Sequence, residues 1–180
     1  MDSAVLHLNP ENPIRGALRA ALRVPDDVQV RLHRGGRPAW FLEMAWDGTE
    51  TVGCGDRFYA EPAADGFSLV AAFNGQPAGY LSAELSRGDG EGEAHIEMVQ
   101  VDANHRGARV GSALAAGLAE ILLRETDGRL ASGEEPPLWT VTADTESERA
   151  DRLVRRLQRV LDDDYNTRLG FHEAAEEPGP

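Results

Sequence analysis

Residues 99–114 read VQVDANHRGARVGSAL. An apolar strand end, 99–101, passes through a loop that contains glycine and arginine into an amphipathic helix. Backbone N–H groups at the start of a helix lack an intrahelical partner, and the helix dipole makes that end positive. Together with Arg106 and Arg109, these groups attract an anion such as a pyrophosphate. The stretch therefore predicts a phosphate-binding turn between a strand and a helix.

Two familiar phosphate-binding loops do not fit this stretch. A Walker A loop needs a Lys just before its helix, and all 18 basic residues of the chain are Arg. The dinucleotide-binding fingerprint needs the spacing G-x-G-x-x-G, whereas Gly107 and Gly111 are separated by three residues with no third Gly in register. Both types of nucleotide-binding loop are therefore excluded.

From Arg106 onward the stretch resembles the acetyl-CoA loop of the GNAT acetyltransferase superfamily, usually Arg-Gly-x-Gly-Ile-Gly followed by Ala-Leu. The residues that fall on this pattern are Arg106, Gly107, Val110, Gly111, Ala113 and Leu114. Arg109 stands where the middle Gly is usual, so its side chain must point away from the diphosphate or hold it. Leu169-Gly170-Phe171 is similar to the closing Leu-Gly-Phe of the family. The alternative is a surface turn without a ligand.

The resemblance implies a binding site for acetyl-CoA on the strand end and the loop. Its expected residues are Val99, Gln100, Val101, Arg106, Gly107, Ala108, Arg109, Val110, Gly111 and Ser112. Backbone groups of 99–101 would meet the pantetheine amides and the developing oxyanion, with the Gln100 side chain turned to the other face of the strand. No metal is implied.

His95 and Glu97, on the strand before the loop, are candidate general bases. An acceptor amine is mostly protonated at neutral pH, so a base must remove its proton, directly or through water. Strand alternation places His95, Glu97, Val99 and Val101 on one face. The family often uses a Glu on this strand, which favours Glu97, whereas imidazole ordinarily titrates near neutral pH, which favours His95. The alternative is that both are polar residues near an exposed strand end.

Tyr165 is the candidate acid that protonates the leaving thiol. The family often has a Tyr four residues before its Gly-Phe pair, and here that position is Asn166, with Tyr165 one residue earlier. Either a local bulge restores Tyr165 to the acid position or the thiol leaves without a tyrosine. Cys54 has no Cys-His spacing that would support a nucleophile.

Hydrophobic periodicity predicts an α/β (α+β) fold with a mixed central sheet. Two apolar runs, 67–73 and 78–85, are joined by Asn74-Gly75 into a hairpin, and a mobile turn over 86–93 leads to a third strand at 95–101. This antiparallel meander leads into the loop.

A helix near 110–125 then crosses over to a parallel strand at 138–142, with loop expected over 126–137. In the family these two parallel strands splay apart, and the pantetheine arm enters the gap. A last helix is expected near 146–163. Its polar side carries Arg149, Arg152, Arg155, Arg156 and Arg159. These side chains predict either a solvated face with carboxylate partners or a site for the 3′-phosphate of the cofactor.

The N-terminal part is expected to differ most from the family. A helix near 13–23 precedes a strand with alternating Val28, Val30 and Leu32, and a second strand carries Trp40 and Trp46. We expect one GNAT domain over 1–180. It comprises a divergent acceptor-side region (1–65), an acetyl-CoA-binding core (67–171) and a flexible tail (172–180).

Composition limits the partners and the compartment. A net charge of −13 repels nucleic acid and anionic membranes, and it favours a cationic acceptor. Cys54 is the only cysteine, which excludes an intramolecular disulfide and a cysteine-rich zinc site. The sequence has neither a signal peptide pattern nor 18 consecutive apolar residues, so we expect a cytoplasmic protein without a membrane span.

Three functions fit these features. The leading hypothesis is an enzyme that transfers acetyl from acetyl-CoA to a primary amine by direct attack in a ternary complex. A polyamine or an aminoglycoside-like antibiotic would be the acceptor, or else a protein N-terminus or lysine. The second hypothesis is a non-catalytic acyl-CoA-binding sensor, motivated by Arg109 and the displaced Tyr165. The third is an α/β interaction domain without a cofactor. The oligomeric state stays open, a homodimer included.

Overall fold

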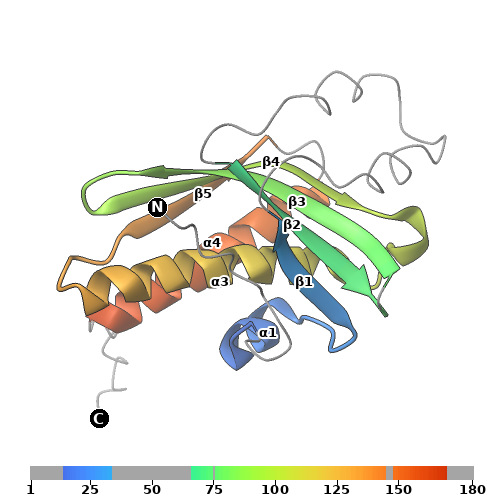
Figure 1. Ribbon diagram of the computed structural model, residues 1–180, viewed down its shortest axis with the longest axis horizontal. Coiled ribbons are helices and arrows are strands. Elements are labelled where there is room, and N and C mark those ends of the chain that lie inside the picture. The colour runs from blue at the N-terminus through green and yellow to red at the C-terminus, as the bar shows by residue number, and fades with distance from the viewer. Residues whose placement is uncertain (1–13, 34–65, 75, 145–147, 170–180) are drawn as a thin grey trace, which may run out of the picture.

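The computed structural model describes residues 14–33, 66–74, 76–144 and 148–169. Within these ranges, five strands form one sheet in the order β1-β2-β3-β4-β5, and three α-helices accompany it (Figure 1). The elements are α1 (Gly16–Leu22), β1 (Val28–His33), β2 (Gly66–Phe73), β3 (Gln76–Arg87), β4 (Glu91–Val101), the 3-10 turn η2 (Ala103–His105), α3 (Val110–Ala131), β5 (Leu138–Ala143) and α4 (Glu148–Leu169).

The sheet is mixed, as the sequence predicts. Strands β1 to β4 pair antiparallel, and β5 pairs parallel with β4. The β2–β3 hairpin turns at Asn74, whose φ of 49° is the left-handed conformation that a tight hairpin turn requires. The crossover from β4 to β5 runs through α3. The predicted strand with Trp40 and Trp46, and the Gly-Phe pair at 170–171, lie outside the described residues.

Three predicted boundaries were wrong. The turn between β3 and β4 takes only 88–90, because Gly90 adopts a φ of 76° and Gly88 N donates to Glu91 O at 2.9 Å, which closes a tight turn. Helix α3 continues to Ala131 because Thr126 is buried against β5, where the Trp139 Nε1 donates to its Oγ1 at 3.0 Å. Helix α4 was expected to end near residue 163, and it continues to Leu169.

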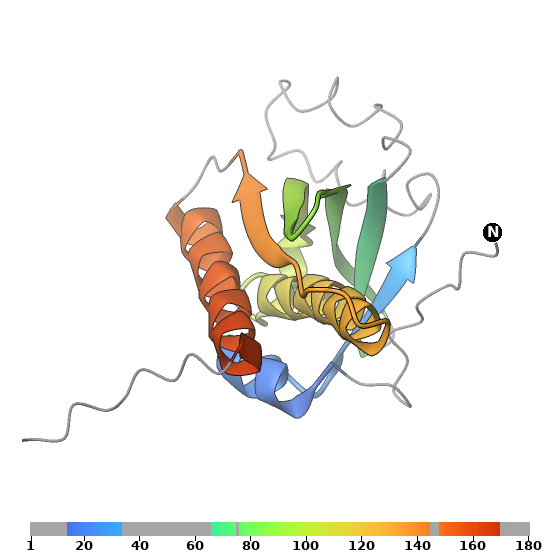
Figure 2. The ribbon, with the colours of Figure 1, turned by 90° about the vertical axis from the view of Figure 1, so that its left-hand side faces the viewer.

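The helices pack on one side of the sheet (Figure 2). Helix α3 lies against the sheet, with Leu114, Leu118 and Leu122 buried in the same core as Leu69 and Leu81 of the strands. We call the opposite side of the sheet the far face. Helix α4 lies beside α3 and contributes Leu157 and Leu161 to this core. None of the helices in the described ranges has the length and hydrophobicity needed to cross a membrane.

Side chains of α4 also cover the outer edge of β5. The Gln158 side chain accepts from Val141 N at 2.7 Å and donates to Trp139 O at 2.8 Å. A strand edge otherwise presents unpaired backbone groups to solvent or to another chain. Gln158 therefore substitutes for a neighbouring strand at this point.

Candidate functional site

The candidate site lies where β4 and β5 part. Their parallel ladder ends at the pair Ile96–Ala143, whereas β4 runs on to Val101. Among the described residues, no strand continues along the β5 side of β4 over 97–101. This backbone edge is the place where the sequence predicts contact with the pantetheine arm.

A β-bulge in β4 changes which side chains share a face. Ser82 pairs with Met98 and the next residue of β3, Ala83, pairs with Ile96, so Glu97 is the extra residue. Bulges shift the alternation of the strand that carries them and are frequent near active sites. The bulge therefore changes the face of the sheet on which the residues after Glu97 lie.

His95 and Glu97 share the far face, as predicted. His95 lies opposite Glu84, and the Ser82 Oγ donates to Glu97 Oε2 at 2.5 Å. Ser82 and Glu84 are two residues apart on β3 and therefore point to the same side. The exposed Glu97 and the half-buried His95 are thus presented together.

The predicted alignment of Val99 and Val101 with that pair was wrong. Val99 lies opposite the buried Leu81, and both valines pack against the hydrophobic core. Gln100 lies opposite Tyr80 and is turned away from the two valines, as expected. Because of the bulge, however, Gln100 ends on the far face with Glu97.

The loop that follows β4 is built from short-range hydrogen bonds. Asp102 N donates to Ala78 O at 2.9 Å, and the Asp102 carboxylate accepts from Asn104 N at 2.7 Å, which starts the turn η2. Ala108 N donates to His105 O at 3.1 Å. These bonds fix the loop relative to the end of β4.

Helix α3 begins at Val110 with its amide groups directed into the loop. The N–H groups of Val110, Gly111 and Ser112 are the first three of the helix and therefore have no intrahelical carbonyl. The first bond from the helix back to the loop is Ala113 N to Arg109 O, at 3.2 Å. A helix of 22 residues adds its dipole to these donors. A helix start of this kind is able to bind an anion.

The two glycines of the motif have different surroundings. Gly107 has a φ of 93°, and a Cβ placed there would meet nothing within 4 Å. A Cβ on Gly111 would lie 3.7 Å from Leu153 of α4. Gly107 therefore supplies a backbone conformation with positive φ beside open space, while Gly111 belongs to the contact between the two helices.

A third glycine, which the sequence reasoning missed, allows β3 to pass close to the loop. A Cβ on Gly79 would lie 2.6 Å from Gln100 O and 3.0 Å from the side chain of Val110. Only glycine fits where β3, the end of β4 and the start of α3 meet. The available signal was a glycine inside the apolar run 78–85, since a glycine within a strand often marks close approach of another backbone.

Tyr165 is not brought to this site by the structure. It lies in the continuous helix α4, twelve residues beyond Leu153, which is about 18 Å along the helix axis. The end of α4 instead adjoins the end of α3, where Arg168 and Asp127 form an ion pair at 2.7 Å. The bulge that would restore Tyr165 to the loop is absent from the described helix.

The arginine-rich side of α4 contains carboxylate partners. Arg152 pairs with Glu148 at 3.4 Å and Arg155 with Asp151 at 2.8 Å, while Arg156 donates to the carbonyl of Ala21. These contacts agree with a solvated helix face. The alternative prediction of a 3′-phosphate site is not needed to explain these three side chains.

The structure also adds residues that sequence reasoning missed. Thr142 of β5 lies beside His95, with its Oγ1 3.0 Å from Nδ1, and donates to Glu93 Oε1 at 2.8 Å. Alternation along each strand places these residues on one face, but it does not give the register between strands that are distant in sequence. That register brings the three together.

Residues 26–134, more than half of the chain, match the model of the acetyltransferase (GNAT) family. The chain belongs to this family. The match includes β4, the loop and α3, and the fold is that of GNAT proteins. GNAT proteins are acetyl-CoA-dependent acetyltransferases. No curated protein sequence gives a significant match.

Several solved structures are similar to this GNAT chain. A ribosomal-protein-alanine N-acetyltransferase from Brucella melitensis has a TM-score of 0.48 and 15% identity over 85% of this chain and 96% of its own. An aminoglycoside acetyltransferase from an uncultured soil metagenomic sample, in complex with sisomicin, has a TM-score of 0.41 and 12% identity over 74% and 88%. An Arabidopsis thaliana protein with the bisubstrate analogue CoA-Ac-MVNAL has a TM-score of 0.40 and 17% identity over 72% and 81%.

Proposed function

We propose that the protein transfers an acetyl group from acetyl-CoA to a primary amine by direct attack in a ternary complex. The observation that carries this proposal is the presentation of His95 and Glu97 on one face of β4, where its ladder with β5 ends. From the end of β4 at Val101, residues 102–109 lead to the start of α3 at Val110, which would hold the diphosphate. The two candidate bases thus lie on the strand that precedes the proposed diphosphate site.

The loop suits the diphosphate of acetyl-CoA, which supplies an acetyl thioester when bound. The open space at Gly107 and the N–H groups of 110–112 would hold the diphosphate, and Arg106 and Arg109 add positive charge. The end of β4 over 97–101, beyond its last ladder pair with β5, would offer backbone groups to the pantetheine amides. These residues would bind and orient the cosubstrate.

Either His95 or Glu97 would remove the proton that the amine must lose. An alkylammonium has a pKa near 10.4 and is not nucleophilic until deprotonated. A positioned base typically contributes about 10²- to 10⁴-fold to such a reaction. Tyr165 lies about 18 Å along α4 from Leu153, the residue next to the start of α3, and this position supports a mechanism without a tyrosine acid from that helix.

The acceptor would be a small cationic amine, such as a polyamine or an aminoglycoside-like antibiotic. Beside His95, the far face carries the carboxylates of Glu84, Glu93 and Glu97. Grouped carboxylates raise the local concentration of a cation and repel anionic partners. A protein N-terminus or lysine side chain would present the same charge and is the alternative acceptor.

The position of Tyr165 gives one specific reason for a second function, a non-catalytic acyl-CoA-binding sensor. Such a module would bind acetyl-CoA in the same loop and release no thiol. A thiol-release assay with acetyl-CoA across polyamines, aminoglycosides, amino acids and peptides separates the two. We expect turnover with at least one cationic amine, and binding without any turnover would favour the sensor.

Variants then test the bases. Glu97→Gln is expected to lower kcat by about 10²-fold or more while acetyl-CoA binding stays intact, and the defect should shrink as pH rises toward the pKa of the amine. His95→Gln receives the same measurements. Glu91→Gln, at the far end of β4, is the matched control. Full activity in both site variants would mean that neither side chain is the base.

A further inference from the structure

His95, Thr142 and Glu93 form a chain of hydrogen bonds across β4 and β5. The His95 Nδ1 lies 3.0 Å from Thr142 Oγ1, and that hydroxyl donates to Glu93 Oε1 at 2.8 Å. His95 and Thr142 are direct neighbours in the ladder, one pair before it ends at Ile96–Ala143. These hydrogen bonds therefore lie at the point where β4 and β5 part.

The hydroxyl has a single proton, which decides the direction of both bonds. An ionised carboxylate only accepts hydrogen bonds, so the proton of Thr142 must point to Glu93. The lone pairs of the same oxygen then remain for His95, and Nδ1 must donate. The imidazole consequently keeps its proton on Nδ1 in both the neutral and the charged form. Only Nε2 is left to gain or lose a proton.

We infer that Thr142 and Glu93 are positioning residues that make Nε2 of His95 the proton acceptor for the incoming amine. This inference rests on the proposed acetyltransferase function. The amine N–H bond breaks, its proton passes to Nε2, and the nitrogen lone pair becomes free to attack the acetyl carbon. The C–N bond forms and the C–S bond breaks, the attacking nitrogen gives its second proton to solvent, and the CoA thiolate leaves and is protonated from solvent.

The charged groups that face His95 come from two strands. Glu84 of β3 lies opposite it, and Glu93 and Glu97 of β4 flank it. Of these, Glu93 is bonded to Thr142, and Glu97 accepts from Ser82. Glu93 is therefore the carboxylate that sets the direction of the Thr142 hydroxyl.

The test is the tautomer of His95, read from long-range ¹H–¹⁵N correlations of ¹⁵N-labelled protein at about pH 8, where imidazole is neutral. His95→Gln assigns the signal among the five histidines. We expect a protonated Nδ1 in the wild type. Thr142→Val and Glu93→Ala should shift the ring toward the Nε2–H form. Thr142→Ser should retain the wild-type tautomer, and so should Glu91→Ala, which removes an exposed carboxylate from the same strand face.

Kinetics supply the second readout. With an amine that the wild type acetylates, Thr142→Val should lower kcat at least tenfold without changing the Kd for acetyl-CoA, and Thr142→Ser should restore it. An Nε2–H tautomer in the wild type, or a tautomer unchanged by Thr142→Val and Glu93→Ala, would overturn the inference. If no amine is acetylated but the tautomer responds as expected, the proposed function fails while the positioning of His95 stands.

Discussion

At the scale of single residues, the loop depends on backbone conformations that side chains disfavour. Gly107 has a φ of 93°, which glycine adopts without cost. Arg109 has a φ of 58° at the N-cap of α3, and its side chain makes no capping hydrogen bond. A residue with a Cβ loses roughly 1–2 kcal/mol in this left-handed conformation. Arg109 is therefore strained where the family usually has glycine.

Replacing Arg109 by glycine should stabilise the protein. We expect Arg109→Gly to raise the free energy of unfolding by about 0.5–1 kcal/mol, because the relief of strain exceeds the added backbone entropy of the unfolded chain. Urea denaturation measures the change. Arg106→Gly is the control, since Arg106 has an ordinary φ of −63° and gains nothing from glycine. A loss of stability in both variants would show that Arg109 is not strained.

The motif in this loop could be predicted from sequence because its residues are contiguous. The bulge at Glu97 could not, since it is defined by the pairing of β4 with β3 rather than by a local pattern. For this reason the prediction that these side chains share one face was confirmed for His95 and Glu97, and it was wrong for Val99 and Val101. The role of Thr142 was hidden for the same reason, because parallel register is set by packing.

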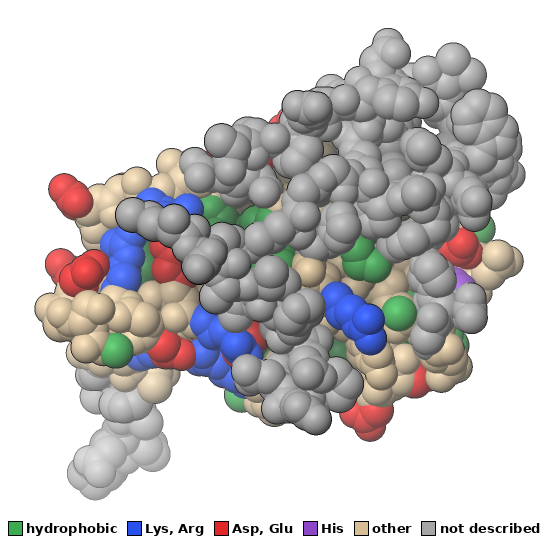
Figure 3. All heavy atoms as spheres, viewed as in Figure 1, with side chains coloured by type: hydrophobic (Ala, Val, Ile, Leu, Met, Phe, Trp, Pro, Cys, Tyr) green, Lys and Arg blue, Asp and Glu red, His purple; other side chains and the backbone are tan. Residues whose placement is uncertain are grey.

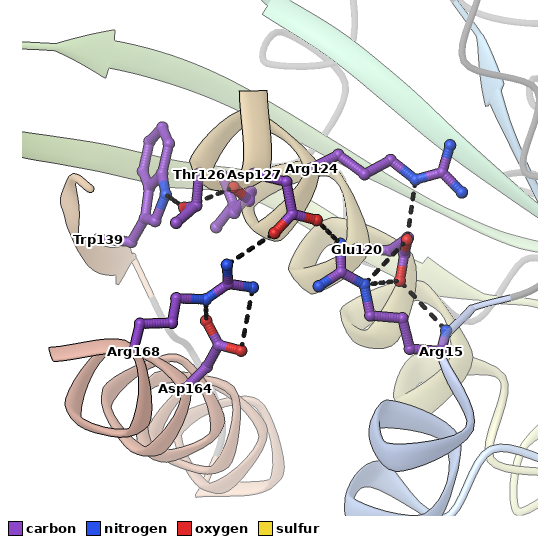
Figure 4. A network of polar contacts seen from close by, with 9 residues as sticks. Arg15, Glu120, Arg124, Thr126, Asp127, Trp139, Asp164 and Arg168 are labelled. Carbon is purple, nitrogen blue, oxygen red and sulfur yellow. Dashed lines mark hydrogen bonds and ion pairs between the residues drawn. The ribbon is translucent and has the colours of Figure 1, made fainter. Parts of the chain in front are cut away.

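At the scale of elements, three helices are joined by one polar network (Figure 4). The buried carboxylate of Glu120 in α3 accepts from Arg15 N at 3.1 Å, next to α1, and from Arg124 Nε at 2.8 Å. Two turns beyond Glu120 along α3, Asp127 bonds to both Arg15 and Arg168. The network fixes the ends of α1 and α4 against α3.

Asp127 gives this network a pH dependence. Burial raises the pKa of the Asp127 carboxyl, but the hydrogen bonds and positive charges of Arg168 and Arg15 lower it by more, so its pKa in the folded protein lies below 3.8. A lowered pKa contributes stability that is present above the unfolded value and is lost as pH falls through the folded value. Asp127→Asn should therefore cost about 0.5–1 kcal/mol at pH 7, a small value because the pair is partly exposed and screened.

This cost should shrink as pH falls below 3.8, when the wild-type carboxyl also becomes neutral. Urea denaturation at a series of pH values measures it. Asp163→Asn is the control, because Asp163 is exposed on α4. We expect this variant to have the same stability as the wild type. A difference between wild type and Asp127→Asn that stays constant down to low pH would show that the effect is not electrostatic.

The kinds and order of elements followed from hydrophobic periodicity, whereas their ends did not. The hairpin of β2 and β3 and the crossover through α3 carry local signals. The extra turns of α3 depend on a bond between Thr126 and Trp139, which lie on different elements. Helix ends are set by such tertiary contacts, so composition alone placed the end of α3 at the wrong residue.

At the scale of the whole molecule, the charged side chains behind the net charge of −13 are unevenly distributed over the surface. On the side shown in Figure 3, acidic and basic side chains lie next to one another where α3 and α4 end. The far face of β3 and β4 instead groups Glu84, Glu91, Glu93 and Glu97. Acetyl-CoA is itself an anion, so under the proposed function the start of α3 would have to overcome an unfavourable net charge. Its local amide groups and arginines then decide whether the anion binds.

Calorimetric titration of CoA into three proteins tests this account most directly. The proteins are the wild type, Gly107→Gln and Gly107→Glu, where both variants carry the same backbone strain and nearly the same side-chain size. We predict that the wild type binds CoA and that the glutamine variant keeps binding within about tenfold. The glutamate variant should lose at least another tenfold, about 1.4 kcal/mol, because its carboxylate faces the diphosphate. Absence of CoA binding by the wild type at millimolar concentration, or equal affinities of the two variants, would contradict the assignment of this loop.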